Sequence, residues 1–254
     1  MVRQYGYIEK ALNSAIKIAH RIIIYKSAHV LHMNDNFNLS RLKNIGFISL
    51  NMDVRHITDT LFPLVQKYKD DEYTEIEFRL GKFNGTMFDT NVGKVAFDQI
   101  MMGLSKFPGW EKMVGAEHEV FYRVSDGVRI STDQATGEEV IIKKERIINH
   151  DFKHMLNTPY DIRFSVSKET PLPEDADREM DKKKTKQRLS YIRKNVSIDL
   201  TIMTGDSHDM DAEESVTYQV EFEIIVPSSV QTRDDLFKII HKINDVFIML
   251  NNIR

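Results

Sequence analysis

The chain contains no cysteine among its 254 residues. Disulfide bonds, thiolate metal sites and cysteine nucleophiles are therefore excluded, which suits a reducing compartment. The chain also lacks any run of about 18 uncharged apolar residues, the length that a transmembrane helix needs, so we expect no contact with a membrane. Its most apolar early stretch, residues 16–25, is interrupted by Lys17, His20 and Arg21, and we expect an amphipathic helix from about Ile8 to Tyr25.

A strong excess of charge of one sign is absent as well, because the net charge is -3 and the pI is near 6.3. No overall nucleic-acid-binding surface is expected, so any basic site must be local. A phosphate-binding Walker A loop is also missing: Gly93-Lys94 has Phe88 where that motif needs its first glycine.

The composition is that of a globular protein, with 41% hydrophobic and 29% charged residues. We expect an N-terminal extension over 1–50, partly helical, and a main domain over 51–254. Helical spacing recurs at 53–68 and at 91–106, and a closing helix begins after Thr232. Between 117 and 226 short alternating segments follow one another, which is typical of a β-meander or barrel.

Two polar insertions, at 171–186 and 204–215, interrupt these strands and are expected to be solvated loops. The sequence His150-Asp151-x-x-His154 has the look of a metal site. We expect it instead to lie near a short helix at 150–156 as ordinary surface histidines.

Two strands carry alternating acidic residues, at 74–81 and 218–224. Since side chains two apart share a face of a strand, the polar rows are separated from apolar rows. The polar rows are Glu75, Glu77 and Arg79 on the first strand and Gln219, Glu221 and Glu223 on the second; the apolar rows are Ile76, Phe78 and Leu80, and Val220, Phe222 and Ile224.

Each acidic row alone could belong to an ordinary half-buried strand whose acids face water. The pair favours another interpretation, because neighbouring like charges repel unless a cation lies between them. Four facing carboxylates make an oxygen-rich site that suits Mg²⁺ or Mn²⁺. We therefore predict a metal site formed by Glu75, Glu77, Glu221 and Glu223.

Basic and polar rows lie on the strands between these two. Arg129 and Arg163 lie on separate strands, and Lys186 and Arg188 share a row with Ser190, as Asp199 does with Thr201. A barrel with these rows inside would have a charged lumen, and its apolar residues would pack outward against helices. A polyanion together with a metal ion is the natural occupant of such a lumen.

These motifs, in this order, resemble those of the fungal and viral metal-dependent RNA 5′-triphosphatases of mRNA capping, within the triphosphate tunnel metalloenzymes. The resemblance covers roughly 55–254 and rests on TEIEFRLG, VRIS, YDIRFSVSKETPLP, TKQRLSYI, SIDLTI and YQVEFEI. It implies an α+β fold, namely a closed antiparallel eight-stranded β-barrel with a charged interior and flanking helices. Residues 51–254 would be this tunnel domain.

The resemblance also implies the activity and the roles of residues. The expected substrate is the 5′-triphosphate end of RNA, possibly also NTPs, and the cofactor is Mg²⁺ or Mn²⁺. A guanylyltransferase is the expected partner, since Asp126-Gly127 lacks the lysine of a Lys-x-Asp-Gly motif, and the site of action is the nucleus or a viral replication site. The implied residues are Glu169, which positions water; Arg129, Lys186 and Arg188, which clamp phosphate; Arg79, Arg163, Ser190, Asp199 and Thr201, which bind or orient substrate; and the four metal-binding glutamates.

Two residues depart from the expected pattern, because Gln219 replaces an acidic residue and Ser197 a basic one. Two alternative functions stay open at this point. A related tunnel enzyme acting on free tripolyphosphate or nucleoside triphosphates would need the same residues. A non-catalytic barrel that binds polyanions or scaffolds a capping complex would tolerate alanine at Glu77 and Glu223.

Overall fold

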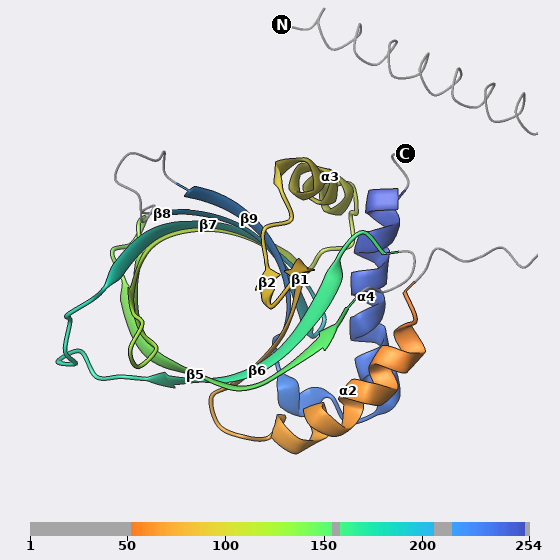
Figure 1. The fold of residues 1–254 in the computed structure, drawn as a ribbon, viewed down its shortest axis with the longest axis horizontal. Coiled ribbons are helices and arrows are strands. Elements are labelled where there is room, and N and C mark those ends of the chain that lie inside the picture. The colour runs from red at the N-terminus through yellow and green to blue at the C-terminus, as the bar shows by residue number, and fades with distance from the viewer. Residues whose placement is uncertain (1–51, 154–157, 206–214, 252–254) are drawn as a thin grey trace, which may run out of the picture. The chain divides into compact units, whose positions relative to one another are not determined.

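The computed structural model describes residues 52–153, 158–205 and 215–251, which form a β-barrel flanked by helices (Figure 1). The expected extension at 1–50 and most of the acidic insertion at 204–215 lie outside the described residues. The strands are β1 (Thr74–Asn84), β2 (Met87–Asp89), β3 (Lys112–Arg123), β4 (Val128–Asp133), β5 (Glu139–Phe152), β6 (Asp161–Pro171), β7 (Lys182–Arg193), β8 (Val196–Gly205) and β9 (Ser215–Ile224).

The barrel contains eight antiparallel strands in the order β1-β6-β5-β4-β3-β7-β8-β9, and β9 pairs with β1 to close it. The short strand β2 extends β1 as a hairpin outside the ring. The closed antiparallel eight-stranded barrel expected from the sequence is thus confirmed. Closure leaves the barrel strands without free edges, so their backbone groups are paired around the ring.

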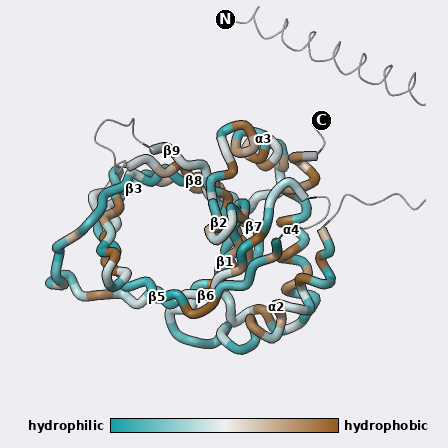
Figure 2. Tube along the Cα trace, in the orientation of Figure 1, coloured by the Kyte–Doolittle hydropathy of each residue, from teal (hydrophilic) through white to brown (hydrophobic). Residues whose placement is uncertain are grey.

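The core lies outside the barrel wall, between the strands and three helices. These helices are α2 (Val54–Tyr68), α3 (Lys94–Ser105) and α4 (Arg233–Asn251), with a 3₁₀ turn, η2, at Pro227–Ser229. The predicted apolar rows of β1 and β9 are buried to 0–1% exposure in the same cluster as the apolar faces of these helices. Figure 2 shows the alternation of polar and apolar residues along the strands. The barrel wall is therefore mostly polar inside and apolar outside where the helices cover it, as the sequence predicts.

The predicted helix ends agree well with the structure. Asp53 caps α2 by accepting from the backbone of His56, and the helix expected from 91 begins at Lys94. Before α4, the Thr232 hydroxyl accepts from the Asp235 backbone while the Asp235 carboxylate accepts from the Thr232 backbone. This reciprocal pair satisfies free N–H groups at the start of a helix. None of the described helices is long and apolar enough to cross a membrane.

The prediction of a solvated loop over 171–186 was confirmed for residues 172–181, most of which are exposed, and wrong for its two ends, which belong to strands. Lys182 to Lys186 belong to β7, and the segment before them packs on the barrel wall opposite the helices. Leu172, Ala176 and Met180 contact a small buried cluster formed by Val128, Ile130 and Ile141. Three apolar side chains spaced four residues apart cover this side of the wall, although charged residues surround them in the sequence.

The prediction of a short helix at 150–156 was wrong for residues 150–152, because β5 continues through Phe152. His150 lies in that strand, and Asp151 accepts a hydrogen bond from Arg163 Nε at 2.7 Å. His154 lies outside the described residues. Asp151 is therefore the ion-pair partner of a predicted site residue.

Candidate active site

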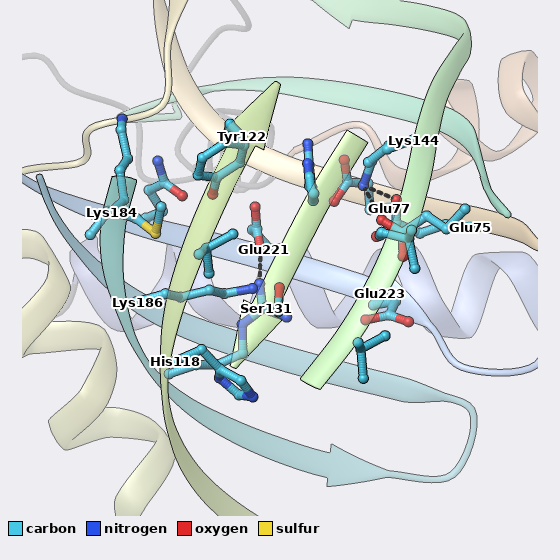
Figure 3. A pocket seen from close by; sticks show the side chains of 18 of the residues that line it. Glu75, Glu77, His118, Tyr122, Ser131, Lys144, Lys184, Lys186, Glu221 and Glu223 are labelled. Carbon is cyan, nitrogen blue, oxygen red and sulfur yellow. Dashed lines mark hydrogen bonds and ion pairs between the residues drawn. The ribbon is translucent and has the colours of Figure 1, made fainter. Parts of the chain in front are cut away.

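The inward-facing rows enclose a cavity of about 700 Å³ that runs through the barrel (Figure 3). Most of the residues singled out from the sequence line it. They are Glu75, Glu77, Arg79, Arg129, Glu169, Lys186, Arg188, Glu221 and Glu223. Arg163 lines a smaller adjoining cavity of about 110 Å³, which shares Glu77, Arg79, Arg129 and Lys144 with the larger one.

The remaining candidates lie behind or beside this surface. Asp199 and Thr201 are 2% and 1% exposed and contact Arg188 rather than the cavity. Ser190 pairs with Asp199 in the β7–β8 register but lines neither cavity. These residues are thus placed to support the wall of the tunnel.

The two acidic rows meet where β9 closes on β1. Glu77 lies opposite Glu223 in the register, and Arg79 lies opposite Glu221. Arg79 bridges the rows, with its Nη2 2.8 Å from Glu77 Oε1 and its Nε 2.9 Å from Glu221 Oε1. The second contact is an ion pair without hydrogen-bond geometry, since the buried Nε has no hydrogen-bond partner.

These four carboxyl groups do not share one protonation behaviour. Burial raises the pKa of Glu77 to about 7, and the neighbouring Glu221 and Glu75 add to it while Arg79 opposes it. Burial, with Glu75 and Asp199, also raises the pKa of Glu223 to about 7. Burial would raise the pKa of Glu221 too, but Arg79 and Arg188 lower it to about 2. Glu221 thus has two close cations, whereas Glu77 has only Arg79 and Glu223 has no ion pair in the described chain, too little positive charge to offset burial.

Lys144 is the central residue that the sequence analysis missed. Its ammonium group bonds to Glu75 Oε2 and lies 2.8 Å from Glu169 Oε1. Ser167 also donates to Glu75 Oε2, at 2.6 Å. Burial would raise the pKa of Glu75, but Lys144 and Ser167 keep it below its ordinary value. Lys144 thus links the first acidic row to the residue expected to position water.

Arg188 is held by three acceptors on the neighbouring strands. It donates to Thr201 Oγ1 at 3.1 Å, to Asp199 Oδ2 at 2.7 Å and to Glu221 Oε2 at 2.5 Å. Such a planar group with several fixed partners has little freedom to reorient. It therefore presents a fixed positive charge next to the acidic rows.

Other cations face the tunnel without an acidic partner. Within the described chain, Arg129, Arg146, Lys184 and Lys186 make no ion pair, although each lines one of the two cavities. Burial, with the repulsion of Arg188, lowers the pKa of Lys186 to about 8. The guanidinium of Arg129 lies 5.4 Å from the centre of the Tyr122 ring. An anion in the tunnel would supply the missing partners.

The two residues that depart from the expected pattern, Gln219 and Ser197, both contact residues of the site. The side chain of Gln219 lines the tunnel and donates to Thr90 Oγ1 at 3.2 Å, so it links β9 to the segment after β2. Ser197 lies opposite Glu223 and donates to Asp199 Oδ1 at 2.5 Å. A small hydroxyl at this position helps to fix the acid that orients Arg188.

The acidic rows offer a hard, oxygen-rich donor set of the type that Mg²⁺ and Mn²⁺ prefer. Among the described residues, however, no three His, Asp or Glu side chains converge into a ready-made ion site. Lys144 forms an ion pair with Glu75, and Arg79 forms ion pairs with Glu77 and Glu221. Glu223 has no hydrogen-bond partner in the described chain. The donor chemistry fits a divalent cation, and the cations now bonded to it would have to give way.

The chain has sequence relatives among mRNA-capping enzyme subunits. A capping enzyme subunit beta of Yarrowia lipolytica is 31% identical over 86 residues, which is 34% of this chain and 22% of that relative. The corresponding subunit of Schizosaccharomyces pombe is 28% identical over 109 residues, 41% of this chain and 36% of that one. The chain thus spans only about a quarter to a third of the length of these relatives.

Solved structures show the same fold. The S. pombe Pct1 RNA triphosphatase superposes with a TM-score of 0.58 at 20% identity, over 79% of this chain and 90% of that one. Pct1 has also been solved in complex with the Spt5 CTD. The RNA triphosphatase domain of a trifunctional mimivirus capping enzyme gives a TM-score of 0.55 at 14% identity, over 78% and 98% of the two chains.

The family model described as mRNA capping enzyme, beta chain, matches residues 115–254, more than half of the sequence. The matched range begins in β3 and includes the strands that carry Arg129, Glu169, Lys186, Arg188 and the second acidic row. The chain therefore belongs to the family of the mRNA capping enzyme beta chain.

Proposed function

We propose that this chain is a metal-dependent RNA 5′-triphosphatase that removes the γ-phosphate from the 5′-triphosphate end of nascent mRNA. One observation carries the proposal: the carboxylates of β1 and β9 face unpaired cations such as Arg129 and Lys186 inside one tunnel. Such a site can bind a divalent cation and a polyanion side by side. The family membership and the RNA triphosphatase activity named for Pct1 and the mimivirus domain support it.

Glu75, Glu77, Glu221 and Glu223 would hold a Mg²⁺ or Mn²⁺ ion. The raised pKa values of Glu77 and Glu223 indicate two buried carboxylates that lack sufficient positive charge. A bound ion supplies that charge and neutralises charge that develops on the transferred phosphoryl group.

The protein side chains would perform the remaining work. Arg129, Lys186 and Arg188 would bind oxygens of the triphosphate, with Arg79 and Arg163 nearby, and Asp199 and Thr201 hold Arg188 in place. Glu169, fixed by Lys144, would orient a water molecule and accept its proton as the water oxygen attacks the γ-phosphorus. The bond from that phosphorus to the oxygen bridging to the β-phosphate breaks. The products are inorganic phosphate and RNA with a 5′-diphosphate end.

The test is release of γ-phosphate from 5′-triphosphate RNA with Mg²⁺, with Mn²⁺ and with EDTA. We expect release only with a metal, and we expect Glu75→Ala and Glu223→Ala to lower it by more than about 100-fold, the upper range for losing a residue that merely orients a metal ligand. Glu145→Ala is the matched control, because Glu145 lies exposed on the barrel wall and pairs with Lys143.

Substrate competition distinguishes the possible activities. Hydrolysis of RNA in preference to ATP and tripolyphosphate would support the capping role. Equal turnover of all three would indicate a general tunnel triphosphatase, and release in EDTA would contradict the metal-dependent mechanism. No hydrolysis of any of the three by the wild type would indicate a non-catalytic barrel, whereas full activity of Glu77→Ala/Glu223→Ala would mean that these two carboxylates do not hold the metal.

A 5′-diphosphate end is the substrate for guanylyl transfer, so a guanylyltransferase is the partner that we propose for this chain. The chain would act where capping takes place, in the nucleus or at a viral replication site. We further propose that residues 51–254 form the catalytic tunnel domain and that 1–50 are an extension.

A further inference from the structure

The two mouths of the tunnel differ in charge. In this antiparallel barrel the ends of β1 and β5 and the starts of β6 and β7 share one rim, from which the β1–β2 hairpin extends. We call this rim the hairpin mouth. Its half of the tunnel and of the adjoining cavity carries the cations Arg79, Arg163, Lys182 and Lys184. Glu77 and Glu221 are the ion-pair partners of Arg79, and Asp151 is that of Arg163.

The opposite rim, the acidic mouth, is formed by the starts of β1 and β5 and the ends of β4, β6 and β9. It carries one cation, Lys144, which pairs with Glu75 and Glu169, and five acids that line the cavity, namely Glu75, Asp133, Glu138, Glu169 and Glu223. A chain of phosphates is repelled by such a rim and attracted by the hairpin mouth.

The inner row of β1 ends in an aromatic step at the hairpin mouth. Continuing the row of Glu75, Glu77 and Arg79 by two residues at a time leads to Gly81 and then Phe83. A Cβ atom on Gly81 would lie 2.3 Å from the Asp89 carbonyl oxygen and 2.7 Å from the Phe88 ring. Glycine at this position therefore lets the Phe88 ring lie directly beyond Arg79.

Two half-exposed rings and two cations form this step. Phe83 and Phe88 face each other across the hairpin with ring centres 5.6 Å apart. Lys153 Nζ lies 3.6 Å from the centre of the Phe83 ring, and the Arg163 guanidinium lies 4.5 Å from that of Phe88. Arg163 thus contacts the rings and also lines the smaller cavity that adjoins the tunnel.

Pairing of the two rings also stabilises a hairpin whose second strand has only three residues. A hairpin alone, however, does not require half-exposed rings with a cation over each of them at the basic mouth of a tunnel. Basic grooves with aromatic side chains are the usual means of binding single-stranded nucleic acid without sequence preference.

We propose that the RNA chain leaves the tunnel through the hairpin mouth, where Phe83 and Phe88 stack on bases of the first nucleotides and Lys153 and Arg163 bind their phosphates. This inference rests on the proposed function, since it concerns the RNA that follows the bound triphosphate. Tripolyphosphate has no base and ATP has only one nucleoside, so neither can contact this step as the following nucleotides of an RNA would. The step therefore gives the site a means to distinguish RNA from free nucleotides.

The first test measures KM for tripolyphosphate, for ATP and for 5′-triphosphate oligoribonucleotides of increasing length. For the wild type we expect KM to decrease as the first few nucleotides are added to the RNA. In the variant Phe83→Leu/Phe88→Leu, which keeps the hairpin apolar, KM for the longer RNAs should rise about tenfold, equivalent to about 1.4 kcal/mol and within the range for one base stacked on a ring. Turnover of tripolyphosphate should stay unchanged.

Phe107→Leu is the matched control. Phe107 is also a partly exposed ring, with the Arg193 guanidinium 4.9 Å from its centre, but it follows α3 and lines no part of the tunnel. If KM does not depend on RNA length, or the double variant behaves like this control, the inference is overturned while the proposed function stands. If the wild type hydrolyses no triphosphate, the proposed function fails, and binding of a labelled 5′-hydroxyl oligoribonucleotide to wild type and double variant still decides the inference.

A second test needs no variant. An RNA with a 5′-triphosphate and 4-thiouridine as its second or third nucleotide is bound in EDTA and cross-linked by light, and the modified peptide is identified by mass spectrometry. We expect cross-links within 82–89 or at Lys153. Cross-links to Asp133 or to Glu138–Val140, at the acidic mouth, would show that the RNA leaves by the other end.

Discussion

Glu77 and Glu223 lie directly opposite each other on the inner wall of the barrel, where β9 closes on β1. Side chains in such a pair are close, and two like charges destabilise it. Burial raises the pKa of both residues to about 7, and the charges of Glu221 and Glu75 add to the shift at Glu77, those of Glu75 and Asp199 to the shift at Glu223. The closure of the barrel therefore creates a place where either protons or a cation must be bound.

This pair predicts how stability depends on pH when no metal is present. The ordinary pKa of both groups is 4.5, so between about pH 5 and 7 the folded protein holds more protons than the unfolded chain. The stabilising contribution of these protons is lost as the pH rises through the folded pKa of about 7. In EDTA, the free energy of unfolding in urea should have a component that falls between about pH 4.5 and 7.5, and Glu77→Gln/Glu223→Gln should lack it.

Divalent metal should reverse this effect, because a metal ligand must be deprotonated to bind. Stabilisation by Mg²⁺ or Mn²⁺, measured as a shift of Tm, should be larger at about pH 8 than at about pH 6, and small in the double variant. A metal-induced shift that is equal at both pH values and survives the double substitution would place the ion elsewhere.

Lys144 and its neighbour Lys143 provide a second, matched comparison. Lys144 contacts Glu75 and Glu169 inside the tunnel, whereas Lys143 pairs with Glu145 on the outer surface. Lys144→Gln should lower kcat for γ-phosphate release by about 100-fold or more, since Glu169 loses the group that fixes it. Lys143→Gln should leave kcat within about twofold, as expected for a surface ion pair. Similar kcat values for the two variants would exclude this role of Lys144.

The same pair of lysines marks a limit of sequence reasoning. The rows of β1 and β9 could be predicted because acidic and apolar residues alternate cleanly there. In β5 the run Ile141-Ile142-Lys143-Lys144 has the same residue type at both parities, so the inward lysine cannot be identified. A β-bulge between Arg146 and Ile148 then shifts the register, so that Arg146 and Asn149 both line a cavity.

The segment 172–181 shows a second limit. Its charged composition correctly predicted a mostly exposed loop, but not that three partly buried apolar side chains four residues apart pack on Val128, Ile130 and Ile141. Hydrogen bonds from Arg123 to Asp177 and from the Val124 backbone to Asp181 fix it on the barrel. Such contacts with strands distant in the sequence leave no local pattern that could be recognised.

Arg188 allows its structural role and its role toward substrate to be separated. Arg188→Met leaves the buried Asp199 without its cation and should destabilise the protein by about 3–5 kcal/mol in urea unfolding. Adding Asp199→Asn removes the uncompensated charge, so the double variant should recover part of this loss. Neither the single nor the double variant should release γ-phosphate. Recovery of hydrolysis together with stability would mean that Arg188 acts only by supporting the fold.

The last prediction concerns the boundary of the tunnel domain. A chain of residues 50–254 should fold and release γ-phosphate at the rate of the full chain, because the described residues contain the whole barrel and both of its apolar clusters. The exact start matters: Met52 is 4% exposed, and its backbone N–H donates to the buried Asn244 at 3.2 Å. A chain that began at Met52 would place a charged terminal amine there, so it should unfold at a lower Tm than the chain that begins at Leu50. Circular dichroism melting and phosphate release measured on both shortened chains test this, and a 50–254 chain that folds but hydrolyses nothing would show that the first 49 residues take part in the reaction.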